Sequence, residues 1–208
     1  MTSHLSLAEQ ADTADLKVFL QRAARLGCEH VRLTSRGRAL VATKQGLLDT
    51  DPTVLGARVF ELTENHEPLD TVVSISGMQD RLARDLHNFV LPLGQAGIAW
   101  AGIAPPVGDW LEHGAVPAQA LIAVAEAGIA EVSAANGLGI KIVTEVRKET
   151  WGRPMFTVGE NADTVVPAGA AFAALGLGFL ADAAEQVALS SSGPWTRLTS
   201  SRGHVLTR

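Results

Sequence analysis

The sequence is poor in several residue types, and each shortage excludes a class of protein. Among 208 residues there is one cysteine, Cys28, and no tyrosine. A single cysteine excludes a disulfide framework and a cysteine-based structural zinc site. The lack of tyrosine excludes any mechanism in which a tyrosine donates a proton. Hydrophobic residues make up 47% and charged residues 19% of the chain, so the sequence predicts a soluble globular protein rather than a disordered one.

Signals for export or membrane insertion are also lacking. The first residues carry no basic cluster and no apolar run, so we expect no signal peptide. One uncharged stretch, residues 164–181, is long enough to cross a bilayer, but it contains Pro167 and three glycines and is flanked by Asp163 and Asp182. Basic flanks are typical of membrane spans. We therefore interpret this stretch as a buried helix and expect a cytoplasmic protein with no membrane partner.

The usual catalytic and cofactor motifs are absent from the sequence. It contains no G-x-S-x-G, S-x-x-K or C-x-x-C motif, and its histidines show no metal-binding spacing. Gly176-Leu-Gly178-Phe-Leu-Ala181 matches a dinucleotide-binding pattern by letters, but an alanine-rich segment precedes it instead of a strand. We predict no metal and no cofactor, and the motifs leave enzymatic activity open.

Apolar residues at helical spacing predict several helices. The first runs from Leu16 to Leu26 and ends at Gly27, and others cover residues 76–86, 117–135 and 167–189. Residues 140–150 fit a strand or a helix, and Glu145, Lys148 and Glu149 favour the helix because these residue types are disfavoured in strands.

Alternating apolar residues predict two hairpins with Arg-Gly turns and a third strand. The first hairpin turns at residues 35–37, the third strand covers residues 54–62, and the second hairpin covers residues 195–208. The segment from Arg32 to Leu40 reappears in similar form from Arg197 to Leu206. This echo is either a structural repeat or convergence on a favourable turn sequence.

Basic residues are missing from two long segments. No lysine or arginine occurs within residues 85–140 or 154–196, so the predicted strands carry the arginines and the middle helices carry net negative charge. The net charge of the whole chain is −5. This balance argues against a nucleic-acid partner.

Several motifs resemble a known group of proteins. Pro105-Pro-x-Gly-x-Trp110, the alanine-rich helix from Pro117, residues 149–154 and residues 193–206 resemble a family of conserved hypothetical proteins from GC-rich bacteria. The resemblance covers most of the chain and implies one continuous domain. It implies no catalytic residue, because no activity is established for that family.

Together these patterns predict an α+β fold in a single domain of residues 1–208. A mainly antiparallel sheet, built from the two hairpins and the third strand, packs against several helices. If the hairpins share a sheet, their outward side chains gather on one face. Because the planar guanidinium group of arginine suits phosphate and carboxylate groups, we predict a site for a small anionic ligand formed by Arg32, Arg36, Arg38, Arg197, Arg202, His204 and Trp110.

Two functions fit the sequence at this point. The first is a non-catalytic cytoplasmic interaction or regulatory protein that forms a homodimer, because the apolar helices of residues 117–135 and 167–189 exceed the packing needs of one subunit. The alternative is a binder of, or an enzyme acting on, a small phosphorylated or carboxylate ligand at the arginine-rich hairpins. The alternative explanation for these arginines is that they are solvated residues that protect sheet edges.

Overall fold

A computed structural model describes residues 4–44, 53–84, 88–94, 104–159 and 164–208. The chain divides into two compact units: unit 1 holds residues 1–45 and 57–102, and unit 2 holds residues 46–56 and 103–208. The prediction of one domain over residues 1–208 stays a prediction.

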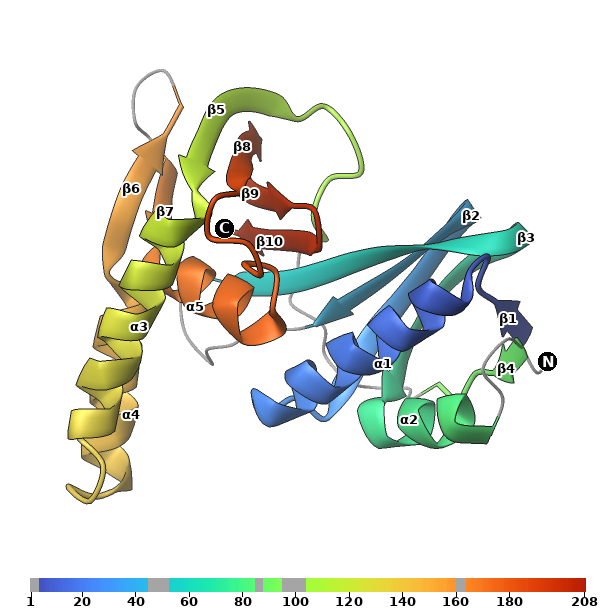
Figure 1. The fold of residues 1–208 in the computed structure, drawn as a ribbon, viewed down its shortest axis with the longest axis horizontal. Helices are drawn as coiled ribbons and strands as arrows, with labels where there is room; N and C mark the ends of the chain where they lie inside the picture. The colour runs from blue at the N-terminus through green and yellow to red at the C-terminus, as the bar shows by residue number, and fades with distance from the viewer. Residues whose placement is uncertain (1–3, 45–52, 85–87, 95–103, 160–163) are drawn as a thin grey trace. The chain divides into compact units, whose positions relative to one another are not determined.

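Unit 1 is a long two-stranded ribbon covered by two helices (Figure 1). Its elements are β1 (His4–Ser6), α1 (Gln10–Arg25), β2 (His30–Lys44), most of β3 (Val54–Ser74), α2 (Ile75–Arg84) and β4 (Asn88–Val90). Strands β1 and β4 form a separate antiparallel pair in which Leu5 lies opposite Phe89. The helices α1 and α2 pack against each other.

The first helix forms as its apolar spacing predicts. Leu16, Phe19, Leu20 and Ala23 lie on one face and are buried, which is the arrangement expected of an amphipathic helix. The helix ends at Arg25 with Leu26 as its C-cap, and Gly27 follows with φ +82°. This left-handed conformation is the one for which glycine is favoured after a helix.

The predicted hairpin at residues 35–37 is wrong, because β2 continues through it from His30 to Lys44. Contacts with β3 show why. Arg32 bonds to Asp70, Ser35 bonds to the carbonyl of Glu67, and Arg38 bonds to the carbonyl of Leu62. As the β2 numbers rise the β3 numbers fall, so the strands are antiparallel along this length.

Strand β3 is also longer than predicted, because residues 63–68, whose polar composition suggested a loop, remain in the strand. A long partner strand offers backbone hydrogen bonds that a sequence pattern does not reveal. The next helix, α2, begins at Ile75, where the Gly77 N–H donates to Ser74 Oγ at 3.1 Å. Ser74 therefore caps this helix, two residues before the predicted start of the helix at residue 76.

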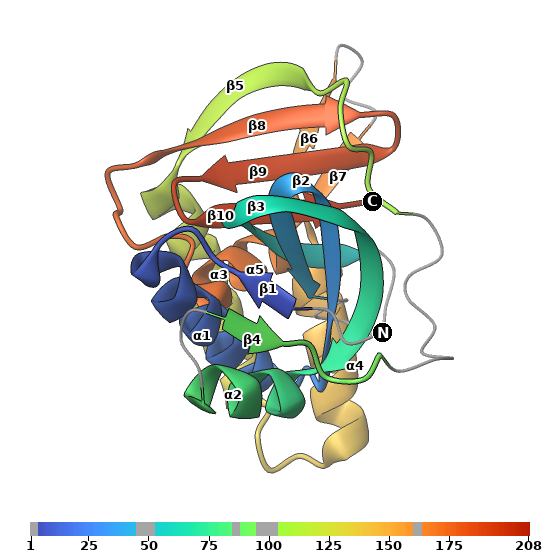
Figure 2. The same ribbon diagram turned by 90° about the vertical axis from the view of Figure 1, so that its right-hand side faces the viewer.

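Unit 2 combines an antiparallel sheet with three helices and a small second sheet (Figure 2). Its elements are β5 (Leu111–Pro117), α3 (Ala118–Ala134), α4 (Ile140–Gly152), β6 (Pro154–Val158), β7 (Thr164–Pro167), α5 (Ala168–Leu177), β8 (Gln186–Ser192), β9 (Trp195–Ser200) and β10 (Gly203–Thr207). The pair β6–β7 is antiparallel, and α3, α4 and α5 pack together.

The main sheet has the hydrogen-bonded strand order β2-β3-β10-β9-β8-β5. Strand β3 contributes its first residues, 54–56, to unit 2. There the backbone N–H and carbonyl groups of Thr53 and Arg208 bond reciprocally, both at 3.1 Å. Helices and a mainly antiparallel sheet confirm the predicted α+β class.

Two predictions for unit 2 are confirmed. Residues 140–152 form a helix, and residues 195–207 form a hairpin in which Val205 lies opposite Leu198. The Arg-Gly echo is not a structural repeat, because its first copy lies in the continuous strand β2 while its second copy turns between β9 and β10.

The predicted helix over residues 167–189 is too long. Helix α5 ends at Leu177, because Gly178 adopts the left-handed conformation at φ +74° and its N–H bonds to the carbonyl of Leu175 at 2.9 Å. Leu189, placed in that helix by its apolar character, lies in β8. A buried strand and a buried helix have similar composition, so length and hydrophobicity alone do not separate them.

Candidate functional site

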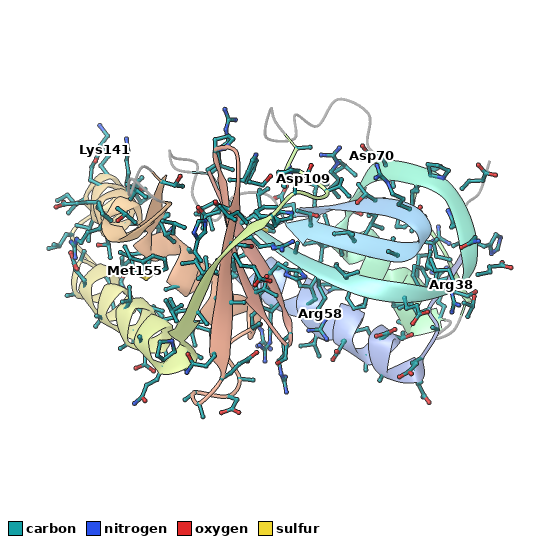
Figure 3. All side chains as sticks on the ribbon, turned by 90° about the horizontal axis from the view of Figure 1, so that it is seen from above. Arg38, Arg58, Asp70, Asp109, Lys141 and Met155 are labelled. Atoms are coloured by element: carbon teal, nitrogen blue, oxygen red, sulfur yellow. The ribbon has the colours of Figure 1, made fainter. Side chains whose placement is uncertain are left out.

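The predicted anion-binding arginines of unit 1 bind carboxylates of the same chain. Arg32 donates from Nε and Nη2 to the two carboxylate oxygens of Asp70, at 2.7 and 2.6 Å. Arg38 pairs with Glu61 at 2.9 Å and donates to the carbonyl of Leu62 at 3.0 Å. Figure 3 shows Asp70 and Arg38 at separate places along the β2–β3 ribbon. Arg36 is exposed on β2.

The Arg32–Asp70 pair changes the titration of its carboxylate. The two hydrogen bonds from Arg32 hold the pKa of the Asp70 carboxyl below its ordinary value, because they stabilise the ionised form. A guanidinium group has five N–H donors, and the bonds of Arg32 to Asp70 and of Arg38 to Glu61 and the carbonyl of Leu62 link β2 to β3. Arg32 and Arg38 therefore stabilise the ribbon.

The predicted residues of unit 2 gather on one face of its sheet. Arg197 lies on β9, and its guanidinium carbon is 4.2 Å from the centroid of the Trp110 ring. Two residues on, Thr199 lies opposite His204 and bonds to its Nδ1 at 3.0 Å. Because side chains alternate along strands, Arg197, Thr199 and His204 point to the same side. Arg202 is exposed in the turn between β9 and β10.

Arg197 and Trp110 form an incompletely bonded pair. The Nε atom of Arg197 and the Nε1 atom of Trp110 are buried, and neither has a hydrogen-bond partner among the residues that the structure describes. Burial lowers the pKa of the Arg197 guanidinium, because removal from water disfavours the charged form. The ring of Trp110 compensates in part, since a cation over an indole face is stabilised by about 0.5–2 kcal/mol.

The predicted seven-residue grouping divides between the units: Arg32, Arg36 and Arg38 belong to unit 1, while Arg197, Arg202, His204 and Trp110 belong to unit 2. The single combined site stays a prediction. Within the described parts of the chain, no group of three or more His, Cys, Asp or Glu side chains could hold a metal ion, and no helix is long and apolar enough to cross a membrane.

Sequence reasoning missed a group of cations on the helices of unit 1. Arg22 and Arg25 lie in the last turn of α1, and Arg81 and Arg84 lie in the last turn of α2. Lys17 lies one turn before Arg22. The signal was present in the sequence, because Val18, Arg22 and Arg25 recur at helical spacing opposite the buried residues.

The charges of the two units differ. Unit 1 holds ten Lys and Arg against ten Asp and Glu, while unit 2 holds seven against twelve. The whole net charge of −5 therefore belongs to unit 2. The net charge of the whole chain therefore does not reveal that unit 1 is neutral overall and carries cations on its helices.

Family models divide the chain close to the boundary between the two units at residues 102 and 103. The domain of unknown function DUF8010 matches residues 1–102, and the domain of unknown function DUF8185 matches residues 105–208. No curated protein matches the sequence. These findings confirm the predicted resemblance to a family without an assigned activity, while its origin in GC-rich bacteria stays a prediction.

Solved structures show what the fold is similar to. A Caulobacter crescentus pol III beta structure matches with a TM-score of 0.55 and 12% sequence identity, over 100% of this chain and 65% of that one. DNA polymerase III subunit beta from Pseudomonas aeruginosa matches with a TM-score of 0.55 and 13% identity, over 100% and 64%. A Helicobacter pylori beta clamp in complex with 5-chloroisatin matches with a TM-score of 0.52 and 12% sequence identity, over 100% of this chain and 63% of that one. The chain thus spans less than two thirds of the length of these clamps.

This likeness corrects the functional predictions. The prediction of an interaction or regulatory protein, or alternatively a binder of a small anionic ligand, is wrong, because the fold is that of proteins named DNA polymerase sliding clamps. The same finding contradicts the prediction of no nucleic-acid partner. That prediction rested on the net charge of the whole chain, and the charge is not spread evenly between the units.

Proposed function

We propose, from the premise that this chain belongs to the family of the domain of unknown function DUF8185, that it is a clamp-fold protein that binds duplex DNA through the helices of unit 1. The fold likeness supports the class of function. The cations on α1 and α2 support the choice of surface. We call the surface formed by α1 and α2, along which Lys17, Arg22, Arg25, Arg81 and Arg84 are distributed, the basic helix face.

The geometry of α1 carries the proposal. Val18 is 43% exposed and marks the outward side of the helix, because Leu16, Phe19 and Leu20 are buried on the other side. Arg22 and Arg25 follow Val18 by four and seven residues, so they share its outward side. The side chain of Arg25 is exposed and that of Arg22 is half-buried.

The acids of α1 lie away from this outward side. Asp15 is bound by Arg58 of β3, and Asp12 is half-buried in the first turn. On α2, Asp80 is exposed directly before Arg81. The basic helix face therefore has more cations than anions. The helix α3 of unit 2 has no lysine or arginine at all.

Such a face suits the DNA backbone rather than its bases. Lysine and arginine neutralise phosphates and release counterions, so the logarithm of the binding constant falls by about 0.9 per phosphate contact for each tenfold rise in salt. Five cations set an upper limit of about −4.5 on that slope. Binding of this kind is independent of sequence and weakens steeply with salt.

These arginines also have a purely structural explanation. Cations in the last turn of a helix stabilise it by about 0.3–1 kcal/mol through the helix dipole. That effect changes the free energy of unfolding and leaves DNA affinity unaltered. A binding experiment on folded variants separates the two explanations.

The test is fluorescence anisotropy with a labelled 30-base-pair duplex at low and physiological salt. Arg22→Glu with Arg25→Glu is expected to weaken binding at least tenfold. Arg147→Glu with Lys148→Glu, which changes the charge equally at exposed positions of α4, is the matched control and is expected to stay within twofold of the unaltered protein. Absence of DNA binding at low salt, or equal effects of the two double variants, overturns the proposal.

The proposal includes a cytoplasmic homodimer. Because the proposed ligand is duplex DNA, we place the protein in the cytoplasm. Four apolar side chains on and between α3 and α4 support self-association, because Ile129, Leu138, Ile140 and Ile142 are 39%, 59%, 87% and 48% exposed, and exposed apolar clusters mark interfaces. Light scattering after gel filtration is expected to give twice the mass of the chain. A single-chain mass at micromolar concentration overturns this part.

A further inference from the structure

The outer side of helix α4 in unit 2 presents an exposed apolar side chain between exposed charges. Ile142 is 48% exposed, and Lys141, Glu145 and Glu149 are exposed as well. Ile142, Glu145 and Glu149 follow one another by three and four residues, which places them on one side of the helix. Lys141 borders the same side, one turn before Glu145. The opposite side holds Trp151, which is 2% exposed.

The cation and the anion at the centre of this side have no partner in their own chain. Lys141 and Glu145 are four residues apart, a spacing at which ion pairs form along a helix. Among the residues that the structure describes, no ion pair or hydrogen bond joins either side chain to another. By contrast, Arg153, just after α4, donates to Glu131 of α3 at 3.2 and 2.9 Å. Helix α4 therefore offers one charge of each sign to a second molecule.

Further apolar side chains lie at the N-terminal end of α4. Leu138, in the turn between α3 and α4, is 59% exposed, and Ile140, the first residue of α4, is 87% exposed. Figure 3 shows Lys141 on the outside of the helix at this end. Exposed apolar side chains thus extend from the turn to Ile142. A cluster of this kind marks an interaction surface, whereas single exposed apolar residues are ordinary.

We propose that two copies of the chain associate through α4, with the two helices antiparallel and centred on Val143. Lys141 and Glu145 are each two residues from this centre, so Lys141 of one copy lies beside Glu145 of the second copy, and the reverse. Ile142 contacts Ile142 of the second copy. The inference rests on the homodimer of the proposed function and names the surface that forms it.

Helical geometry allows both contacts at once. Lys141 and Ile142 are consecutive, so they lie about 100° apart around the helix axis, and Glu145 lies between them. In an antiparallel pair related by a twofold axis, each border of the contact faces the same border of the second copy. The two ion pairs therefore form along one border and the isoleucine contact along the other, at an interaxial distance of about 8–10 Å.

Charge favours a second copy over DNA and over pairing through α3. The phosphates of a duplex would approach the exposed Glu145 and Glu149. Helix α3 has no lysine or arginine, and a twofold contact through its outer side would bring the exposed Glu126 of the two copies together. Like charges across an interface disfavour association. Helix α4 carries both signs one turn apart, so it is complementary to an antiparallel copy of itself.

The test is charge reversal followed by sedimentation velocity over a concentration series at physiological salt. Lys141→Glu and Glu145→Lys are each expected to raise the dissociation constant of the dimer at least tenfold, because the twofold axis creates two pairs of like charges. The double variant restores opposite charges and is expected to lie within threefold of the unaltered protein.

Arg147→Glu is the matched control, since it makes the same charge change as Lys141→Glu at an exposed position of α4. Arg147 lies about 160° around the helix from Glu145 and therefore outside the contact. Its dissociation constant is expected to stay within twofold of that of the unaltered protein.

A mixture of the two single variants separates a lost contact from damaged folding. In the mixed dimer, the acid introduced at position 141 faces the lysine introduced at position 145, and the native Glu145 faces the native Lys141. Equimolar mixing is expected to restore the dimer, although each variant alone stays dissociated at the same concentration. Circular dichroism verifies the helix content of each variant.

Three results overturn the inference. A dimer that neither reversal weakens has its interface elsewhere, and the proposed homodimer stands. Reversals that weaken the dimer without recovery in the double variant or the mixture exclude the pairing of Lys141 with Glu145. A single-chain mass for the unaltered protein at micromolar concentration overturns the inference and the homodimer together. The proposed DNA binding is tested on residues of unit 1, so its failure is a separate observation.

Discussion

Gly128 of α3 lies directly against the indole ring of Trp151 on α4. A Cβ atom at position 128 would lie 2.3 Å from Cζ3 and 2.6 Å from Cη2 of that ring. Trp151 is 2% exposed and stacks on Phe172 of α5, with ring centroids 4.3 Å apart. One glycine therefore allows the three helices of unit 2 to share a single aromatic contact.

Gly128→Ala is expected to destabilise the protein by up to about 2 kcal/mol, because overpacking costs about 1–3 kcal/mol and the gain in helix propensity, about 1 kcal/mol, offsets part of it. The measurement is urea unfolding followed by circular dichroism. Gly152→Ala, where an added Cβ meets no atom within 4 Å, is the control and is expected to be neutral or slightly stabilising. A stabilised Gly128→Ala would contradict the close packing.

Gly178→Ala is expected to cost about 1–2 kcal/mol of stability, because an L-residue in the left-handed region carries that penalty and Gly178 has φ +74° at the end of α5. Thermal unfolding checks the effect. Gly108→Ala, with no positive φ and open space around its Cα, serves as the comparison. Equal melting temperatures for the two variants would show that α5 does not need this cap.

Asp70→Asn is expected to lower stability near neutral pH and to have no effect at strongly acidic pH. Arg32 holds the pKa of Asp70 below its ordinary value, and the unfolded value is about 3.9. A lowered pKa in the folded state contributes stability above the unfolded pKa, and this contribution is lost as the pH falls through the folded pKa.

The size of this effect is small, since the Asp70 side chain is 58% exposed and exposed ion pairs contribute about 0–1 kcal/mol. Urea unfolding at pH 7, 4 and 2.5 measures it. Arg32→Gln removes the partner and is expected to show the same pH dependence. A difference from the unaltered protein that grows as the pH falls would contradict the assigned pair.

Trp110 and Arg197 are expected to be energetically coupled. In a double-mutant cycle with Trp110→Leu and Arg197→Met, we expect a coupling free energy of about 0.5–2 kcal/mol, the range for a cation over an aromatic face. Chemical unfolding of the four proteins gives the value. The same cycle with Arg202→Met is expected to show none, and a zero for Arg197 would mean that the two side chains do not interact in solution.

Local patterns predicted the elements whose structure is decided locally. The helix over residues 140–152, the end of α1 at Gly27 and the hairpin between β9 and β10 all follow from propensity, helical spacing or turn chemistry. They need few contacts with distant residues, so a single sequence contains their determinants.

The predictions for β2 and α5 were wrong for a different reason. The Arg-Gly turn in β2 is overridden by its long partner β3, and α5 is shorter than its apolar run because Gly178 ends it. The ion-pair partners of Arg32 and Arg38, which are Asp70 and Glu61, also lie far away in the sequence. Pairing between distant residues depends on the register of two strands, which composition does not encode.

Strand β3 has a consequence for how the chain is built. Its first residues complete the sheet of unit 2 by pairing with the end of β10, where Thr53 meets Arg208, and its remainder belongs to unit 1. A fragment cut between residues 102 and 105, where the two family models meet, would lack this strand. The C-terminal half made alone would expose an unpaired β10, an edge open to aggregation. During synthesis, β10 must find a partner made near the start of the chain, and such long-range closure slows folding.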